Sequence, residues 1–110
     1  MNKNSYNTAL IIGFGLIGSS IARVVKEKKI VKKIYAVDNN QTNINIAKEL
    51  ELVDDIYGSI NELSFQFDLV FICTPLSSYK KIFKELNNFI TEPTLITDVG
   101  STKVSVIKDF

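Results

Sequence analysis

Short apolar runs alternate along the chain with longer segments of mixed polarity. Four strongly hydrophobic runs of about five residues stand out, at residues 9–13, 34–38, 69–73 and 94–98. Continuous apolar runs of this length are typical of strands that are buried on both faces of a sheet. A weaker run at residues 53–57, interrupted by Asp54-Asp55, predicts one more short strand.

Between these runs, apolar residues recur at helical spacing. In residues 16–28, Ile17, Ile21, Val24 and Val25 share one face and charged residues the other, which predicts an amphipathic helix. The same reasoning predicts helices over residues 40–50, from Ser77 or Ser78 to Phe89, and from Thr102 to Phe110, with only a turn or two of helix between Gly58 and Phe67.

The alternation of strand and helix predicts the fold class. Strand, helix and strand at this rhythm require a parallel sheet with right-handed crossovers. We therefore expect a doubly wound α/β fold, a single domain over residues 1–110. Residues 1–7 are mostly polar and precede the first run, so we expect them to be flexible.

Composition removes several function classes. With 13 basic and 12 acidic side chains, the net charge of +1 argues against a nucleic-acid partner, which would need a basic surface. The lone Cys73 cannot form an internal disulfide, and we expect it to be a small buried residue. No apolar run approaches the roughly 20 residues of a membrane span, so we expect no membrane association and a cytoplasmic location.

The chain contains no histidine. A Ser-His-Asp triad, a Cys-His pair and a histidine-ligated metal site are therefore impossible within these residues, and we expect no metal.

The strongest chemical motif lies at the first turn. Gly13, Gly15 and Gly18 form G-x-G-x-x-G between a predicted buried strand and a helix. Gly13 permits the tight turn, Gly15 allows a pyrophosphate to approach the backbone, and Gly18 lets the helix pack close to the sheet. The helix begins at Leu16 and Ile17, where unpaired N–H groups would bind an anion. The alternative is a turn that serves tight packing only.

Asp38 ends the second predicted strand, 20 residues after Gly18. A carboxylate at this place can accept hydrogen bonds from both hydroxyls of an adenosine ribose, although it can also form a turn with Asn39 and Asn40. A carboxylate repels a 2′-phosphate, and no arginine follows to hold one, so NAD is expected rather than NADP. A methyltransferase uses a similar arrangement but does not usually need Gly18.

Two further loops leave strands at the same edge of the predicted sheet. Thr74, Pro75 and Leu76 follow the central strand, where ligands bind in open α/β sheets, and we expect them to line the cofactor crevice. Ser101 and Lys103 follow the fifth strand. Ser101 can simply cap the next helix. Lys103 would oppose the helix dipole, which suggests an anionic ligand unless it is an ordinary exposed lysine.

Taken together, these segments resemble the prephenate/arogenate dehydrogenase family. The resemblance rests on residues 11–20, 36–38 and 97–103, above all on Leu-Ile-Gly-Ser-Ser and Asp-Val-Gly-Ser-x-Lys, and extends from Thr8 onward. It implies a Rossmann-type NAD(P)-binding domain and oxidative decarboxylation on the route to tyrosine, with prephenate or arogenate as the small anionic substrate. It also implies that Ser101 contacts the ring hydroxyl of the substrate, with Lys103 beside it in the catalytic set.

The resemblance covers only the amino-terminal half of such an enzyme. The family places its catalytic histidine in a Gly-x-His-Pro segment shortly after residue 103, followed by a helical dimerisation domain, and neither occurs here. We therefore expect a fragment, truncated before the helical domain of a homodimer, that binds NAD but is inactive alone. Two alternatives stay open: the cofactor domain of another dehydrogenase, such as a 3-hydroxyacid dehydrogenase or an imine reductase, and a non-catalytic nucleotide-binding module.

Overall fold

The structure is a computed structural model that describes residues 6–98 and 104–107. Its strands are β1 (Tyr6–Ile12), β2 (Val31–Val37), β3 (Asp55–Tyr57), β4 (Leu69–Ile72), β5 (Thr94–Asp98) and β6 (Val104–Ile107). Its α-helices are α1 (Leu16–Glu27), α2 (Gln41–Glu49) and α3 (Tyr79–Phe89), and two single 3-10 turns, η1 (Ile60–Glu62) and η2 (Leu76–Ser78), precede β4 and α3.

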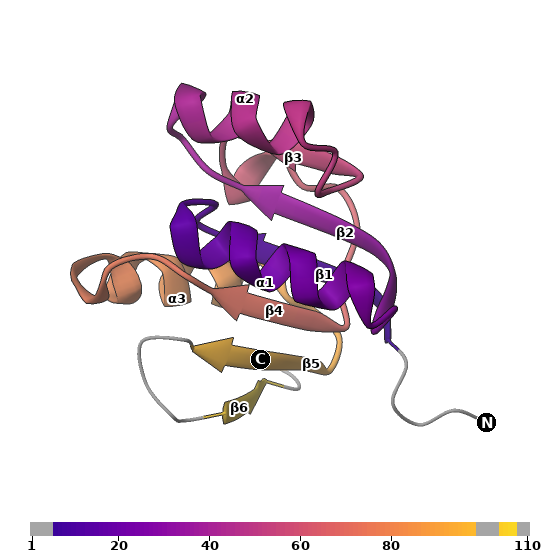
Figure 1. Ribbon diagram of the computed structural model, residues 1–110. Coiled ribbons are helices and arrows are strands. Elements are labelled where there is room, and N and C mark those ends of the chain that lie inside the picture. Colours follow the sequence, from indigo (N-terminus) through magenta and orange to yellow (C-terminus); the bar gives the residue numbers. More distant parts are fainter. Residues whose placement is uncertain (1–5, 99–103, 108–110) are drawn as a thin grey trace.

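The described strands form one sheet in the order β3-β2-β1-β4-β5-β6 (Figure 1). The first five are parallel to one another, which confirms the predicted doubly wound sheet. The chain leaves β1 toward β2 and β3 and then returns to β4 on the other side of β1. The strand order thus reverses between β1 and β4, and ligands of such sheets bind at the carboxyl end of this reversal.

The prediction of a helix over residues 102–110 is wrong for its central part. Residues 104–107 form β6, which pairs antiparallel with β5 from Thr94↔Ile107 to Thr97↔Val104. Three of these four residues are β-branched valine or isoleucine, which favour extended backbone when a partner strand is at hand. The remainder of the expected helix lies outside the described residues.

The start of the first strand also differs from the expected one. β1 begins at Tyr6, whose backbone N–H donates to the Ile30 carbonyl over 2.9 Å, so the strand includes two residues that we expected to be flexible. Residues 1–5, the rest of that segment, lie outside the described residues.

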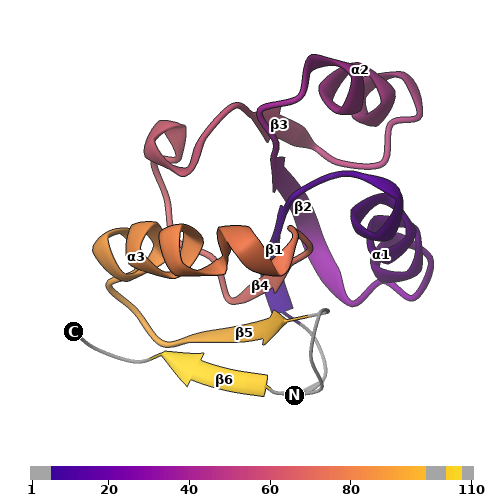
Figure 2. The same cartoon turned by 90° about the vertical axis from the view of Figure 1, so that its left-hand side faces the viewer.

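Helices cover both faces of the sheet, with α1 and α2 on one side and α3 on the other (Figure 2). Because successive side chains of a strand point to opposite faces, β1 contributes to two cores. Leu10 and Ile12 pack with the α3 residue Leu86, whereas Ile11 packs with Ala22 of α1. These side chains are almost completely buried. No helix in the described ranges is long and apolar enough to cross a membrane.

Candidate functional site

A cleft of about 400 Å³ opens at the carboxyl edge of the sheet, where the strand order reverses. One wall comes from the β1–α1 turn, the end of β2 and α2; the other comes from the loop after β3, the loop after β4 and α3. The cleft is lined by Ile12, Gly13, Gly15, Val37, Asp38, Asn39, Asn43, Gly58, Ser59, Ile60, Cys73, Thr74, Pro75, Ser78, Lys81, Ile82 and Glu85.

Gly13 makes the turn that opens the cleft. Its φ of +90° lies in the left-handed region, where a residue with a side chain would be strained. A Cβ at this position would also come within 2.8 Å of the Thr74 Cγ2 atom. The Gly13 N–H donates to the Val37 carbonyl over 2.8 Å, which ties the turn to the end of β2. Glycine is therefore required here by the fold itself.

Gly15 and Gly18 differ in what surrounds them. A Cβ on Gly15 would meet nothing within 4 Å, so the backbone lies bare beside the cleft. A Cβ on Gly18 would collide with the Gly13 carbonyl oxygen and reach 3.3 Å from the Ile11 Cγ2 atom. The close helix packing expected of Gly18 is thus present, and Gly15 leaves room for a ligand to reach the main chain.

The first turn of α1 directly follows Gly15, which lines the cleft, although Leu16, Ile17 and Gly18 do not line it. Gly15 precedes the helix, and within the described part of the chain no side chain caps this end and no acidic residue occupies the first turn. Leu16 and Ile17 are 85% and 57% exposed, so this end of the helix is open to solvent. The helix terminus therefore offers unpaired donors and the positive end of a dipole.

Asp38 stands at the end of β2 with its carboxylate held from three directions. Oδ2 accepts from the Phe14 N–H over 2.7 Å and from Asn43 Nδ2 over 3.0 Å, and Oδ1 accepts from the Asn40 N–H over 2.8 Å. Asn40 in turn caps α2, since its Oδ1 accepts from the Asn43 N–H over 3.1 Å. A carboxylate offers about four acceptor positions, so Asp38 keeps capacity for a hydroxyl donor from the cleft.

The loop after β4 lies next to the β1 turn and lines the cleft. The Cys73 N–H donates to the Ile12 carbonyl over 2.8 Å, which holds this loop against the β1 turn. Thr74 and Pro75 line the cleft as predicted, and Leu76 begins η2. The Thr74 Oγ1 atom is buried and has no hydrogen-bond partner among the described residues. A buried hydroxyl without a partner is costly, which points to a ligand group as its partner.

The two predicted substrate residues cannot be placed. Ser101 and Lys103 lie outside the described residues. β5, which precedes them, ends at Asp98 beside Ile72 of β4, at the same sheet edge as the cleft. Their roles therefore stay predictions.

Several residues that line the cleft were not predicted from the sequence. Asn43 lies in the first turn of α2, and Lys81, Ile82 and Glu85 lie on one face of α3. The one available signal was that α3 directly follows a loop at the ligand edge of the sheet. The helical periodicity alone does not tell which residues of α3 line the cleft.

Among the described residues, the titratable groups that line the cleft are Asp38, Cys73, Lys81 and Glu85, and Tyr57 lies next to Gly58 in the sequence. Partial burial raises the pKa of the Tyr57 hydroxyl, at the end of β3, and the Asp55 carboxylate raises it further, so this phenol stays neutral. Across residues 6–98 and 104–107, no three histidine, cysteine or acidic side chains gather as a metal site would require. The arrangement is suited to binding and orienting a ligand.

Comparison with known proteins agrees with this geometry. The family model "Prephenate dehydrogenase, nucleotide-binding domain" matches residues 21–110. A prephenate dehydrogenase of Bacillus subtilis is 35% identical over 102 residues, covering 92% of this chain and 28% of the relative. A cyclohexadienyl dehydrogenase of Zymomonas mobilis is 34% identical over 98 residues, covering 89% of this chain and 33% of the relative.

A solved structure is similar as well. The prephenate dehydrogenase of A. aeolicus, crystallised in complex with hydroxyphenyl propionate and NAD+, superimposes with a TM-score of 0.82 at 30% identity. The match covers 88% of this chain and 34% of the A. aeolicus chain. The chain thus spans about a third of the length of the proteins that it resembles.

Proposed function

The chain belongs to the prephenate dehydrogenase family, as its nucleotide-binding domain, and from this premise we propose that its cleft binds NAD. The whole protein would then oxidise and decarboxylate prephenate or arogenate in tyrosine biosynthesis. The observation that carries the proposal is that a bare glycine turn and Asp38 lie side by side on one wall of the cleft, at the reversal of the sheet. Gly13 and Asp38 also serve the local fold, but packing explains neither the open space beside Gly15 nor the acceptor capacity that Asp38 retains, and a dinucleotide uses both.

The residues present fit this cofactor. The buried Thr74 Oγ1 atom lacks a partner among the described residues, and the space beside Gly15 is open to 4 Å. A dinucleotide has hydroxyl groups and phosphate oxygens that can pair with the Thr74 hydroxyl, and its pyrophosphate can occupy the space beside Gly15. The unpaired N–H groups of α1 would take the pyrophosphate, and the Asp38 carboxylate would accept from the adenosine ribose.

The reaction divides between cofactor and chain. NAD, when bound, accepts a hydride as the substrate ring loses carbon dioxide and becomes aromatic. The residues of the chain orient the cofactor and the substrate, and they disfavour NADP. Asp38 disfavours a 2′-phosphate by charge repulsion, so NAD is favoured over NADP. Ser101 would hold the ring hydroxyl of the substrate and Lys103 its negative charge.

Other properties of the whole protein are proposals of the same kind. We propose a homodimer built through a helical domain, a small anionic substrate, no nucleic-acid partner and a cytoplasmic location. A net charge of +1 and a single cysteine are in keeping with the last two.

Binding and turnover of this chain can be measured separately. Calorimetric titration is expected to show NAD binding, whereas an absorbance assay with prephenate and NAD is expected to show no NADH. The chain has no histidine to act as the base that the family resemblance implies. Absence of NAD binding would refute the cofactor proposal, and NADH formation by these 110 residues would refute the proposed division of roles.

Replacing Thr74 by valine tests the orphaned hydroxyl. Valine keeps the methyl group and removes Oγ1, so the free energy of unfolding without ligand should stay level or rise by up to about 1 kcal/mol. The affinity for NAD should fall by roughly fivefold to tenfold, because a ligand hydrogen bond is lost. Urea unfolding and calorimetry check the two effects.

Thr94→Val is the matched control. The Thr94 Oγ1 atom is buried but donates to carbonyls of Phe67 and Glu92, each at 3.0 Å. This variant should therefore lose about 1 kcal/mol of stability and keep its affinity for NAD. Equal NAD affinities for Thr74→Val and the unaltered chain would contradict the role of Thr74.

A further inference from the structure

Besides the glycine turn and Asp38, the cleft is lined by the segment after β3 and by α3. No sequence motif predicted that these two segments would line it. In this groove, Gly58, Ser59 and Ile60 lie along one side, after β3, and Ile82 and Glu85 of α3 line the other. Figure 2 shows α3 on the face of the sheet opposite α1 and α2. Residues of α3 also contact η1, so the two segments lie close together.

The two sides of this groove combine apolar and charged groups. Ile60 is buried at its base and Ile82 is half-buried on α3, so a flat ring would find apolar atoms on its faces. Glu85 is half-buried beside them and carries a carboxylate. A donor that replaces the water lost on partial burial would stabilise such a carboxylate.

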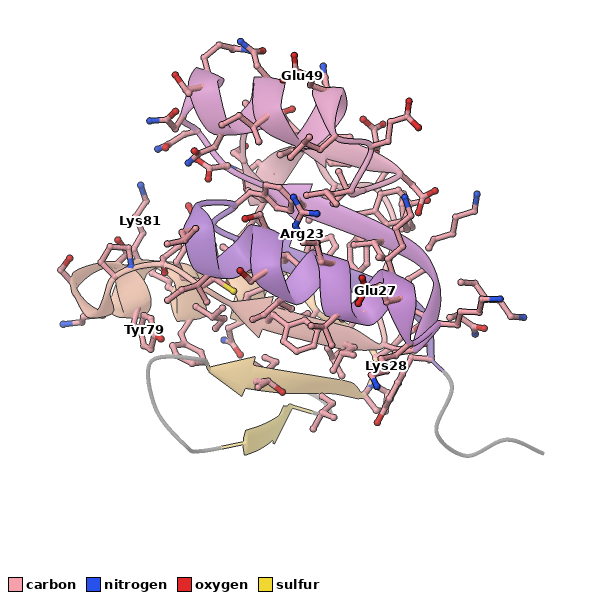
Figure 3. The ribbon with its side chains drawn as sticks, in the orientation of Figure 1. Arg23, Glu27, Lys28, Glu49, Tyr79 and Lys81 are labelled. Carbon is pink, nitrogen blue, oxygen red and sulfur yellow. The ribbon has the colours of Figure 1, made fainter. Side chains whose placement is uncertain are left out.

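Glu85 has no such donor within the described part of the chain. Lys81 lies one turn earlier on α3 and also lines the cleft, yet no ion pair joins the two side chains. Figure 3 shows Lys81 extending from α3 toward the side of the domain on which α2 lies. The Glu85 carboxylate therefore remains available to a donor that enters the groove.

We infer that Glu85 selects the base of the dinucleotide, by accepting a hydrogen bond from the exocyclic amino group of adenine. The inference rests on the proposed NAD binding, because the ribose held by Asp38 places its base in the adjoining groove. Adenine has flat faces for Ile60 and Ile82 and an N–H donor at its outer edge. A carboxylate, which only accepts hydrogen bonds, is the natural partner of that amino group.

The same chemistry excludes a different base. Hypoxanthine carries a carbonyl oxygen where adenine carries the amino group. That oxygen would face the Glu85 carboxylate, and the proton that hypoxanthine carries on N1 lies beside the oxygen, so the carboxylate would lose the donor at the position of the amino group. Sites built around a hydrogen bond reject analogues that lack it far more strongly than apolar pockets reject a missing methylene.

The experiment compares NAD with nicotinamide hypoxanthine dinucleotide, in which a carbonyl oxygen replaces the amino group and N1 carries a proton. Calorimetric titration of the unaltered chain is expected to show NAD binding at least about tenfold tighter, the low end for a charged hydrogen bond in a half-exposed site. Glu85→Gln should bring the ratio to about twofold or less, because a carboxamide can also donate to the hypoxanthine oxygen. Glu85→Ala should also lower the ratio, through weaker NAD binding.

Glu27→Gln is the matched control, since Glu27 ends α1 on the outer surface shown in Figure 3 and does not line the cleft. It should leave both affinities unchanged. Circular dichroism confirms the fold of each variant. If NAD binds but the ratio is the same in all four proteins, the role of Glu85 is refuted and the proposed function stands. If the unaltered chain does not bind NAD, both fail together.

Discussion

Replacing Gly18 by alanine is expected to lower the free energy of unfolding by about 3 kcal/mol, the upper range for overpacking. The added methyl group would collide with the Gly13 carbonyl oxygen, which is backbone and cannot rotate aside. It would also reach 3.3 Å from the Ile11 Cγ2 atom in the core. Relief requires α1 to move away from β1, and that movement would open the turn that forms the cleft. Urea unfolding followed by circular dichroism measures the loss.

Gly15→Ala is the matched variant in the same turn. Its methyl group would meet nothing within 4 Å, so the free energy of unfolding should change by less than about 0.5 kcal/mol. The methyl group would nevertheless occupy the place where a pyrophosphate approaches the main chain. Calorimetry should show the affinity for NAD falling by about tenfold or more. Similar losses of stability in the two variants would contradict the assignment of separate roles to these glycines.

Asp38→Asn is expected to have the largest effect on binding, a loss of NAD affinity of roughly 10-fold to 100-fold. The carboxylate accepts from two backbone N–H groups, of Phe14 over 2.7 Å and of Asn40 over 2.8 Å. A carboxamide has one oxygen and can serve only one of them. The variant therefore loses the charge that receives the ribose hydroxyls and also leaves an N–H group without its acceptor. Removing the charge should also narrow the preference for NAD over NADP.

Asp54→Asn separates these two effects. Asp54 also accepts from a backbone N–H, that of Ile34 over 2.8 Å, but it lies at the opposite edge of the sheet, where β3 begins. Both variants should lose about 1–2 kcal/mol of stability, and only Asp38→Asn should lose affinity for NAD. A comparable weakening of NAD binding by Asp54→Asn would show that the effect of Asp38 is transmitted through stability.

The glycine turn and Asp38 could be predicted because their signals are local. Gly13 has a positive φ, Gly18 lies against backbone, and Asp38 follows directly on a buried strand, so each requirement is written into a few neighbouring positions. Four of the five parallel strands were predictable because each contains a continuous apolar run, whereas β3 at the edge of the sheet has only a short, interrupted one.

The second wall of the cleft could not be predicted. Glu85 of α3 reaches this wall, as Asn43 of α2 reaches the first one, only through the packing of the two helices on opposite faces of the sheet, which depends on the whole core. β6 was missed because four residues have too little periodicity to distinguish strand from helix, and pairing with β5 decided the outcome. The predicted roles of Ser101 and Lys103 remain untested, as these residues lie outside the described ranges.

The most direct test of NAD binding in this cleft is an NMR titration of the isotopically labelled chain, whose 12.4 kDa size suits the method. Adding NAD should shift the amide resonances of Gly15, Ile17, Asn39 and Thr74. It should leave unchanged those of Lys48 and Asp54, which line a second cavity at the opposite edge of the sheet. No shifts at millimolar NAD, or shifts confined to that second cavity, would contradict the proposed site.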